Sequence, residues 1–238
     1  RIAALFADKS SAELESEAQR RGLPLSPVLA LDQAPVSPQF TSRNAFAAVQ
    51  LAADIAIAAP NGIVEFDGVR AGQAGPPPEL GSGQEMLKTG WPDRVAPASV
   101  PPGEDGALPL KGLRVLDLGG IVVGAETGRL LADLGSEFSK VEKAGFPDGS
   151  RQTRGEPISV SFAVGHRNQR SLGLNLRSEQ GKALFRDLAA KADVILSNFK
   201  PGTLESLGLA PESLLARNPR LIIVDSSAFG STGPESRR

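Results

Sequence analysis

Cysteine is absent from the 238-residue chain, and histidine occurs once. Without cysteine, disulfides, zinc–thiolate centres, iron–sulfur clusters and thiol nucleophiles are excluded. With His166 as the single histidine, a polyhistidine metal site is excluded, and a Ser-His-Asp triad would have to use that residue. We therefore expect no metal site. The absence of cysteine is also consistent with an expected cytoplasmic location.

Long apolar runs and an excess of one charge are missing too. The apolar residues 51–59 are interrupted by Asp54 and fall short of the roughly 20 residues that cross a bilayer. Near the N-terminus, Asp8 and Lys9 break the apolar stretch that a signal peptide requires. Lys and Arg number 26 against 27 Asp and Glu, so no overall positive charge favours nucleic acid or anionic membranes. We expect neither as a partner.

Two regions of ordinary globular composition flank a proline-rich one. Hydrophobic residues make up 40% of the chain and charged residues 22%, which is enough for a buried core. Residues 71–109 contain eight of the 19 prolines, and each proline removes a backbone hydrogen-bond donor. Most of this stretch is predicted to be an extended linker, in which only the surroundings of Met86 and Leu87 could pack.

The first region predicts one clear helix. Ser10 and Glu13 match the capping-box pattern, and the helix that follows is expected to stop at Gly22. Residues 25–31 are predicted to be extended, and residues 63–66 alternate as a half-buried strand does. The chain lacks an initiator methionine, so we expect it to be a piece of a longer protein.

The second region alternates short apolar runs with helical patterns. Strands are predicted at residues 113–118, 138–142, 193–198 and 221–227. One helix is predicted after the first strand with Leu130, Leu131 and Leu134 on one face, a second at 177–192 with Ala183, Leu184 and Leu188 on one face, and a third at 211–216. This alternation predicts an α/β fold with a parallel sheet, whose ligands bind beyond the carboxyl ends of the strands. The loops selected by that rule start at Gly119, Lys143, Asn198 and Ser226.

Three of these loops could bind an anionic nucleotide. Glycines in residues 119–124 allow close backbone approach before a helix N-terminus, although the spacing is not G-x-G-x-x-G and a plain tight turn is the alternative. Lys143 closes the second strand, where a cation can pair with a phosphate, or it is an ordinary surface lysine. Asn198 and Phe199 could bind and stack on a base, or form only a turn.

The remaining candidates have less support. His166 could act as a base near neutral pH, but no partner spacing accompanies it, which favours a loop or surface histidine. Asp117 and Asp225 lie near strand ends, where carboxylates often act, and for Asp117 we expect a structural hydrogen bond. No catalytic residue is predicted from these patterns.

Taken in order, the loops resemble the opening segment of the family III CoA-transferases. This group includes formyl-CoA and carnitine CoA-transferases, bile-acid CoA-transferases and 2-methylacyl-CoA racemases. The similar stretches are LKGLRVLDLGGIVVGAETGRLLADLGSEFSKVEKAGFPDGSRQTRG, GHRNQRSLGLNLRSEQGKALFRDLAAKADVILSNFKPGTLESLGL and NPRLIIVDSSAFGSTGP. The resemblance implies a Rossmann-like α/β domain with a smaller second domain, and dimers whose two chains interlock.

The resemblance also implies a site for coenzyme A (CoA), with an acyl-CoA and a carboxylic acid acceptor as substrates. The residues at CoA-contacting positions are Gly120, Ile121, Val122, Val123, Lys143, Arg170, Leu172, Asn198 and Phe199. Lys143 would hold a CoA phosphate. The first loop departs from the family because it lacks the usual polar side chain and the proline, which puts ordinary CoA affinity in question.

The resemblance extends to the first region. LFADKSSAELESEAQRRGLPLSPVLALDQAPVSPQF is similar to the family's small C-terminal domain, and GPPPELGSG is similar to its closing segment. We therefore interpret residues 1–83 as the tail of one transferase-like copy, residues 84–109 as a linker and residues 110–238 as the head of a second copy. Such a chain would form a homodimer or a tandem pseudo-dimer within one chain.

The activity implied is CoA transfer between carboxylic acids. Family transferases form covalent adducts on an aspartate downstream of the Gly-x-Thr-Gly-Pro turn, and racemases have a His-Asp pair just beyond it. The chain ends four residues after Pro234, so we expect it to supply the CoA-binding part and to be inactive alone. The alternatives are a 2-methylacyl-CoA racemase and a non-catalytic module for CoA binding or dimer formation.

Overall fold

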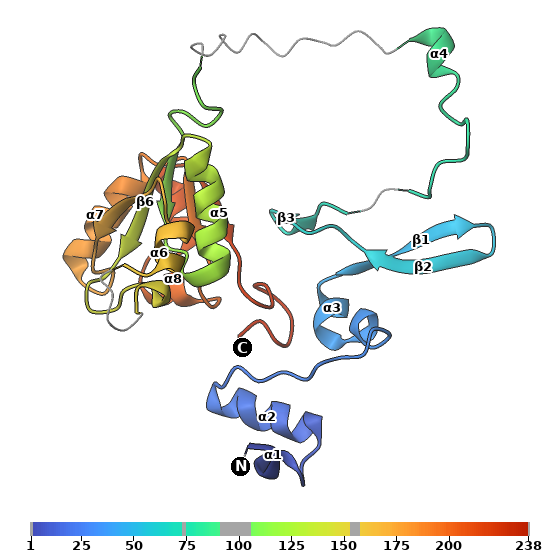
Figure 1. Ribbon diagram of the computed structural model, residues 1–238, viewed down its shortest axis with the longest axis horizontal. Helices are drawn as coiled ribbons and strands as arrows, with labels where there is room; N and C mark the ends of the chain where they lie inside the picture. Colours follow the sequence, from blue (N-terminus) through green and yellow to red (C-terminus); the bar gives the residue numbers. More distant parts are fainter. Residues whose placement is uncertain (1, 73–74, 91–105, 153–157, 238) are drawn as a thin grey trace. The chain divides into compact units, whose positions relative to one another are not determined.

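The structure is a computed structural model that describes residues 2–72, 75–90, 106–152 and 158–237. The chain divides into two compact units, each of which is considered by itself (Figure 1). The first comprises Arg1–Gly103 with Thr232–Glu235, and the second Glu104–Ser231 with Ser236–Arg238. Within the described ranges, no helix has the length and apolar character needed to cross a membrane.

The first unit consists of short helices and two antiparallel hairpins. Its helices are α1 (Ile2–Phe6), α2 (Ser11–Arg21), η1 (Ala34–Val36), α3 (Pro38–Ser42) and α4 (Met86–Thr89). Its strands are β1 (Phe46–Ala52) paired with β2 (Ile55–Pro60), and β3 (Glu65–Phe66) paired with β4 (Val69–Arg70). Ala18 is the one fully buried hydrophobic residue among those described in this unit, so its core is small.

Local sequence explains two features of this unit. Ser10 caps α2 by accepting from the Glu13 amide, while the Glu13 carboxylate accepts from the Ser10 amide, which confirms the predicted capping box. Gly22 ends the helix in the left-handed conformation. Asp67 and Gly68 both have positive φ, as the two-residue turn between β3 and β4 requires.

Other expectations for the first 109 residues need correction. The predicted strand at 63–66 is reduced to the two residues of β3. The β1–β2 hairpin was not predicted, because its many alanines have low strand propensity and only cross-strand pairing supports it. In the predicted linker, Met86 and Leu87 form α4 but remain exposed. Residues 91–105 lie outside the described residues.

The second unit is an α/β domain with a five-stranded parallel sheet. Its elements are β5 (Arg114–Asp117), α5 (Ile121–Asp133), β6 (Glu137–Glu142), η2 (Gly149–Arg151), α6 (Val160–Gly165), β7 (Arg170–Gly173), α7 (Glu179–Ala189), β8 (Val194–Ser197), α8 (Thr203–Ser206), α9 (Pro211–Arg217) and β9 (Ile222–Asp225). The strand order is β7-β6-β5-β8-β9, and every neighbouring pair is parallel. The four predicted strands therefore form, and the predicted fold class is confirmed.

Apolar side chains fill both faces of this sheet. On one face, Phe185 of α7 and Leu214 of α9 pack with Leu116 and Ile195 from the strands. On the other, Ala132 of α5 packs with Val115 and Phe138, among others. Figure 1 shows α5 and α7 on opposite sides of the sheet. Because β5 and β8 are covered on both faces, they consist almost entirely of buried residues.

The buried faces of the helices differ from those predicted. In α5 the buried residues are Gly124, Ala125, Gly128 and Ala132, whereas Leu130 and Leu134 are largely exposed. In α7, which begins after its N-cap Ser178, the buried residues are Gly181, Phe185 and Ala189, and Leu184 is exposed. The prediction used leucine as the marker of burial, but close approach of α5 to the sheet requires small residues instead.

One such close approach joins the sheet to the start of α5. A Cβ atom on Gly124 would lie 2.7 Å from both the Cα and the carbonyl carbon of Gly119. Because the obstacle is backbone, no side-chain rotation can make room for it. The contact fixes where the loop after β5 lies against the first turn of the helix.

We predict that Gly124→Ala destabilises the α/β unit. Overpacking costs about 1–3 kcal/mol and alanine regains about 1 kcal/mol of helix propensity, so the expected net loss is up to about 2 kcal/mol. The free energy of unfolding would be measured by urea titration followed by circular dichroism. Gly173→Ala is the control, because a Cβ there meets no atom within 4 Å. Equal stability of the two variants would contradict the prediction.

Candidate functional site

A pocket of about 940 Å³ lies at the carboxyl ends of the strands in the second unit. The order of the sheet reverses at β5, which pairs with β6 on one side and with β8 on the other. In parallel α/β sheets such a reversal opens a crevice between the loops that follow the two central strands. Here those loops begin at Leu118 and at Asn198, and both line the pocket.

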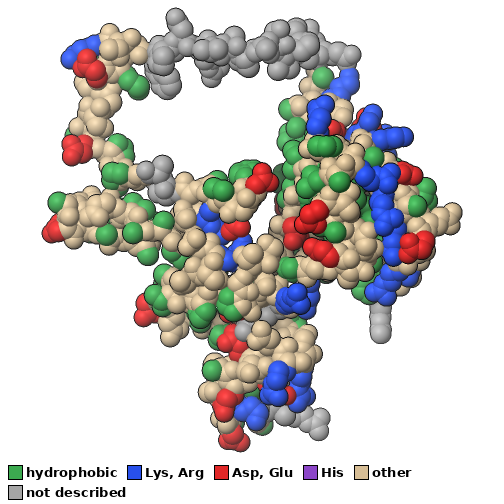
Figure 2. Space-filling model, turned by 180° about the vertical axis from the view of Figure 1, so that it is seen from behind, with side chains coloured by type: hydrophobic (Ala, Val, Ile, Leu, Met, Phe, Trp, Pro, Cys, Tyr) green, Lys and Arg blue, Asp and Glu red, His purple; other side chains and the backbone are tan. Residues whose placement is uncertain are grey.

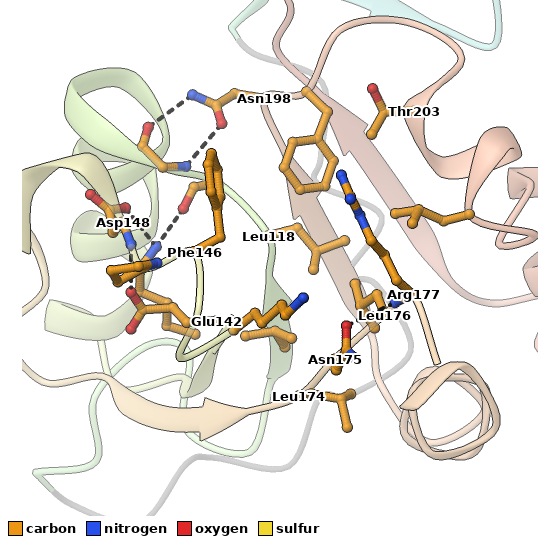
Figure 3. Close-up of a pocket in the computed structure, with 18 of the residues that line it drawn as sticks. Leu118, Glu142, Phe146, Asp148, Leu174, Asn175, Leu176, Arg177, Asn198 and Thr203 are labelled. Atoms are coloured by element: carbon orange, nitrogen blue, oxygen red, sulfur yellow. Dashed lines mark hydrogen bonds and ion pairs between the residues drawn. The ribbon is translucent and has the colours of Figure 1, made fainter. Parts of the chain in front are cut away.

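Asn198 joins these two loops directly. Its side-chain oxygen accepts a hydrogen bond from the Gly120 amide at 2.9 Å, and its side-chain nitrogen donates to the Gly120 carbonyl at 2.9 Å (Figure 3). The amide group therefore satisfies both backbone groups of one residue across the crevice. It holds the glycine loop in place from the β8 side.

A buried charged cluster lies beneath the same loop. The Lys140 ammonium of β6 is 3.1 Å from Asp148 Oδ2 and 3.7 Å from Asp117 Oδ2, and it donates to the Gly119 carbonyl at 2.5 Å. The side chains of all three charged residues are at most 4% exposed. Asp117 Oδ1 accepts from the Gly119 amide at 2.7 Å, which is the structural hydrogen bond expected for it.

The two carboxyl groups of this cluster have opposite pKa shifts. Burial raises the pKa of Asp117 to about 7, against the opposing effect of Lys140. Burial also disfavours the charged form of Asp148, but hydrogen bonds from Ser150 and the nearby Lys140 ammonium hold the pKa of Asp148 well below its usual range. One buried cation thus faces one firmly ionised carboxylate, and Asp117 holds or releases its proton near neutrality.

His166 borders this cluster instead of lying at the surface. Its ring is nearly buried, with Nε2 3.6 Å from Asp148 Oδ2 and Nδ1 3.0 Å from Gln169 Oε1. Burial and the Lys140 charge lower the pKa of His166, so it is neutral at physiological pH. His166 lies in the turn after α6, as expected of a loop histidine, but its burial shows that a surface position is wrong. The residue is not among those that line the pocket.

Glu142, at the end of β6, contributes an already paired carboxylate to the pocket wall. Arg151 donates to it through Nε and Nη2 at 3.0 and 2.8 Å, and the Asp148 amide donates at 3.1 Å. The Arg151 guanidinium also lies 3.5 Å from the centre of the Phe162 ring. Although burial opposes ionisation, these donors keep the pKa of Glu142 below its usual value.

Two cations on the pocket wall have no ion-pair partner within the described part of the chain. They are Lys143, in the loop after β6, and Arg177, in the loop after β7. Figure 3 shows Arg177 on the side of the pocket opposite Phe146. Lys182 also lines the pocket but is paired with Glu179 at 2.8 Å. The pocket is therefore a place where an anion can find two available cations.

The structure brings together some of the sequence-predicted residues and not others. Gly120, Ile121, Lys143, Asn198 and Phe199 all line the pocket. The others are not among the lining residues: Val122 and Val123 are exposed on α5, Arg170 is exposed at the start of β7, and Leu172 packs against the core. Asp225 accepts from Ser197 at 3.1 Å and likewise lies outside the pocket.

The residues that sequence reasoning missed follow strand β7. The pattern Arg-Ser-Leu-Gly is too short and polar to predict a strand, so the loop after it was never selected. That loop supplies Leu174, Asn175, Leu176 and Arg177 to the pocket. Had β7 been recognised, the strand-end rule would have pointed to residues 174–177, whereas the resemblance pointed to Arg170 and Leu172 within the strand.

Side chains of both charges occur on the face of the molecule drawn in Figure 2. Figure 2 shows Lys and Arg side chains on both units with Asp and Glu among them. Among the residues that the structure describes, no group of three or more His, Cys, Asp or Glu side chains is placed to hold a metal ion.

The chain is similar to CoA-transferases along its whole length. A probable CoA-transferase from Mycobacterium tuberculosis is 44% identical over 238 residues, which is all of this chain and 30% of that protein. The alpha subunit of a succinyl-CoA–L-malate CoA-transferase from Chloroflexus aurantiacus is 35% identical over 182 residues, covering 69% of this chain and 40% of that subunit. The chain thus spans less than half the length of these relatives.

A solved structure shares its fold with more than half of the chain. The crystal structure of a hypothetical protein from Mycobacterium tuberculosis is 42% identical, with a TM-score of 0.52 over 56% of this chain and 37% of that one. Residues 110–238, which form the sheet and the pocket, match the sequence profile of CoA-transferase family III. With the parallel sheet, the strand-end pocket and this match in agreement, the chain belongs to CoA-transferase family III.

Proposed function

We propose that this chain supplies the CoA-binding part of an enzyme that transfers CoA between carboxylic acids. The observation on which this rests is the pocket at the reversal of the sheet, where Lys143 and Arg177 have no ion-pair partner among the described residues. CoA presents three phosphate groups, and cations at strand ends are suited to pair with them. Membership of the family supports the same ligand.

The pocket offers different chemistry to different parts of CoA. Lys143 and Arg177 would pair with phosphates, whereas Leu118, Phe146 and Phe199 offer apolar surface for the base or the pantetheine arm. Phe146 is 81% exposed, so a ligand that covers it removes apolar surface from water. Asn198 would act by keeping the glycine loop in position, because its amide is already engaged with Gly120.

The proposed reaction needs a carboxylate nucleophile that this pocket does not offer. Attack of an aspartate on an acyl-CoA thioester would give a mixed anhydride and release the CoA thiolate. The thiolate would then attack the aspartyl carbonyl of the anhydride, which expels the donor carboxylate and leaves an enzyme–CoA thioester. The acceptor carboxylate would displace CoA from this thioester to form a second anhydride, from which CoA takes the acceptor acyl group and frees the aspartate. Two carboxylates line the pocket, and both are engaged: Glu142 with Arg151, and Asp148 with Lys140. We therefore assign CoA binding to this chain and covalent chemistry to a residue that it does not contain.

We also propose that the two units are parts of consecutive transferase-like copies. The first unit would be the end of one copy, and the second unit the start of the next. The Mycobacterium relative supports this proposal, because it matches both units and the connection between them in one longer protein. The copies would associate as a pseudo-dimer, or two chains as a homodimer.

A non-catalytic module is the second candidate, and the first loop favours it. Ile121, Val122 and Val123 place exposed apolar side chains where family members commonly have a polar one. A module of this kind would serve assembly and bind CoA weakly or not at all. A racemase is the third candidate, and its His-Asp pair would lie just beyond the turn that ends at Pro234. A measurement of CoA binding separates the first two candidates.

We predict that CoA binds to the chain and that Lys143→Ala weakens binding about tenfold, the loss expected for one charge-assisted hydrogen bond. Arg177→Ala should have a similar effect. Isothermal titration with CoA and with dephospho-CoA would show which cation pairs with the 3′-phosphate, because that cation's substitution should matter less for dephospho-CoA. Lys191→Ala is the control, since Lys191 precedes β8 at the other edge of the sheet.

The outcomes of this titration are distinct. Unchanged affinity in both Lys143→Ala and Arg177→Ala would remove the phosphate assignment. A wild-type chain that does not bind CoA at millimolar concentration would favour the non-catalytic module.

We predict that the chain alone forms no covalent CoA adduct. The paired state of Glu142 and Asp148 leaves neither carboxylate available for attack on a thioester. The chain would be incubated with succinyl-CoA or acetyl-CoA and its intact mass measured before and after treatment with hydroxylamine. A CoA-sized increase in mass that hydroxylamine reverses would show that a nucleophile is present after all.

A further inference from the structure

Ile121, the first residue of α5, has an unusual backbone conformation. Its φ is +57°, in the left-handed region that β-branched residues rarely occupy. Such conformations persist only where surrounding contacts impose them, and they concentrate at functional sites. Ile121 lines the pocket, and its side chain is more than half exposed. Packing of the side chain in the core therefore does not explain the strain.

Asp148 provides the contact that imposes this conformation. The Ile121 amide donates to Asp148 Oδ2 at 3.1 Å, from 27 residues earlier in the sequence. Asp148 is itself fixed, because the Ser150 amide and hydroxyl donate to its Oδ1 at 2.8 and 2.5 Å. The neighbouring residue, Gly120, is held from the other side by Asn198. The side chains of Asn198 and Asp148 thus hydrogen-bond two successive residues of the turn, Gly120 and Ile121.

Lys140 contacts both Asp148 and the first residue of the turn, Gly119. Its ammonium neutralises Asp148 at 3.1 Å and also binds the Gly119 carbonyl. A buried ion pair contributes little net stability, since desolvation offsets the attraction, and apolar residues of similar size often serve stability as well. Apolar residues could neither accept a hydrogen bond from the Ile121 amide, as Asp148 does, nor donate one to the Gly119 carbonyl, as Lys140 does. The pair is therefore better explained by the geometry of the turn than by stability.

We propose that Asp148, with Lys140 as its counter-ion, is a positioning residue for the CoA site. It holds Ile121 in the left-handed conformation and thereby fixes the Gly119–Gly120–Ile121 turn against the pocket before CoA arrives. This inference rests on the proposed CoA-binding function. Asp148 acts through the turn and does not itself contact CoA.

A double-mutant cycle between Asp148→Ala and Ile121→Gly tests this role. In the Ile121 background, loss of Asp148 lets the strained residue relax, so the turn moves and the CoA dissociation constant should rise at least tenfold. In the Ile121→Gly background, positive φ is unstrained, so the same loss should change the dissociation constant less than threefold. A merely structural contribution of Asp148 would weaken binding equally in both backgrounds, and that result would overturn the proposal.

The urea midpoint of unfolding gives a second reading that does not depend on CoA. Ile121→Gly should raise the urea midpoint more, or lower it less, when Asp148 is present than in the Asp148→Ala chain. The reason is that the backbone strain exists only where Asp148 imposes it. An identical effect in the two chains would also overturn the proposal. If the wild-type chain binds no CoA, the proposed function fails and this inference fails with it. Binding without coupling refutes the inference alone.

The Asp148→Ala chain is expected to fold. Asp117 lies 3.7 Å from Lys140 and can become its counter-charge when Asp148 is absent. If Asp148→Ala still fails to fold by circular dichroism, the cycle is repeated with Lys140→Met/Asp148→Ala, which removes both charges and should show the same coupling to Ile121→Gly. Loss of coupling in that pair would count equally against the proposal.

Discussion

The position of β5 at the reversal of the sheet is the constraint on which the rest of the site depends. Because β5 pairs in parallel with both β6 and β8, the loops that follow all three strands emerge at one edge. The glycine loop then lies between Asn198 from β8 and Lys140 from β6. Lys140 lies in β6 and Asn198 directly follows β8. Each side chain reaches the loop because its strand is the hydrogen-bonded neighbour of β5.

The buried charges beneath the glycine loop are paired with one another. Lys140 is a single buried cation beside two carboxyl groups, and the protein ionises Asp148 firmly while Asp117 holds its proton more readily. The carboxylate at the pocket edge, Glu142, is neutralised separately by Arg151. As a result, among the described residues that line the pocket, the cations without an ion-pair partner are Lys143 and Arg177. A pocket that contains its own carboxylates can in this way still favour an anion.

The two units differ in how far they depend on other parts of a protein. The α/β unit has apolar cores on both faces of its sheet. In the described part of the first unit only one hydrophobic residue, Ala18, is fully buried. Short hairpins and helices with so little buried surface gain stability mainly from what they pack against. This contrast fits the proposal that the first unit is the end of a larger copy, as does the longer Mycobacterium relative.

The sequence by itself determined the α/β class, four of the five parallel strands, the capped helix α2 and the strand-end loops at Gly119, Lys143 and Asn198. These features depend on local periodicity and on the rule that ligands bind at strand ends, and both can be applied to the amino-acid sequence alone. Tertiary structure alone decided that β7 joins the sheet, that small residues form the buried face of α5, and that Arg177 reaches the pocket. It also decided that Lys140, Asp148 and His166 meet. Their proximity arises from pairing between strands and loops distant in sequence, and no local pattern encodes such pairing.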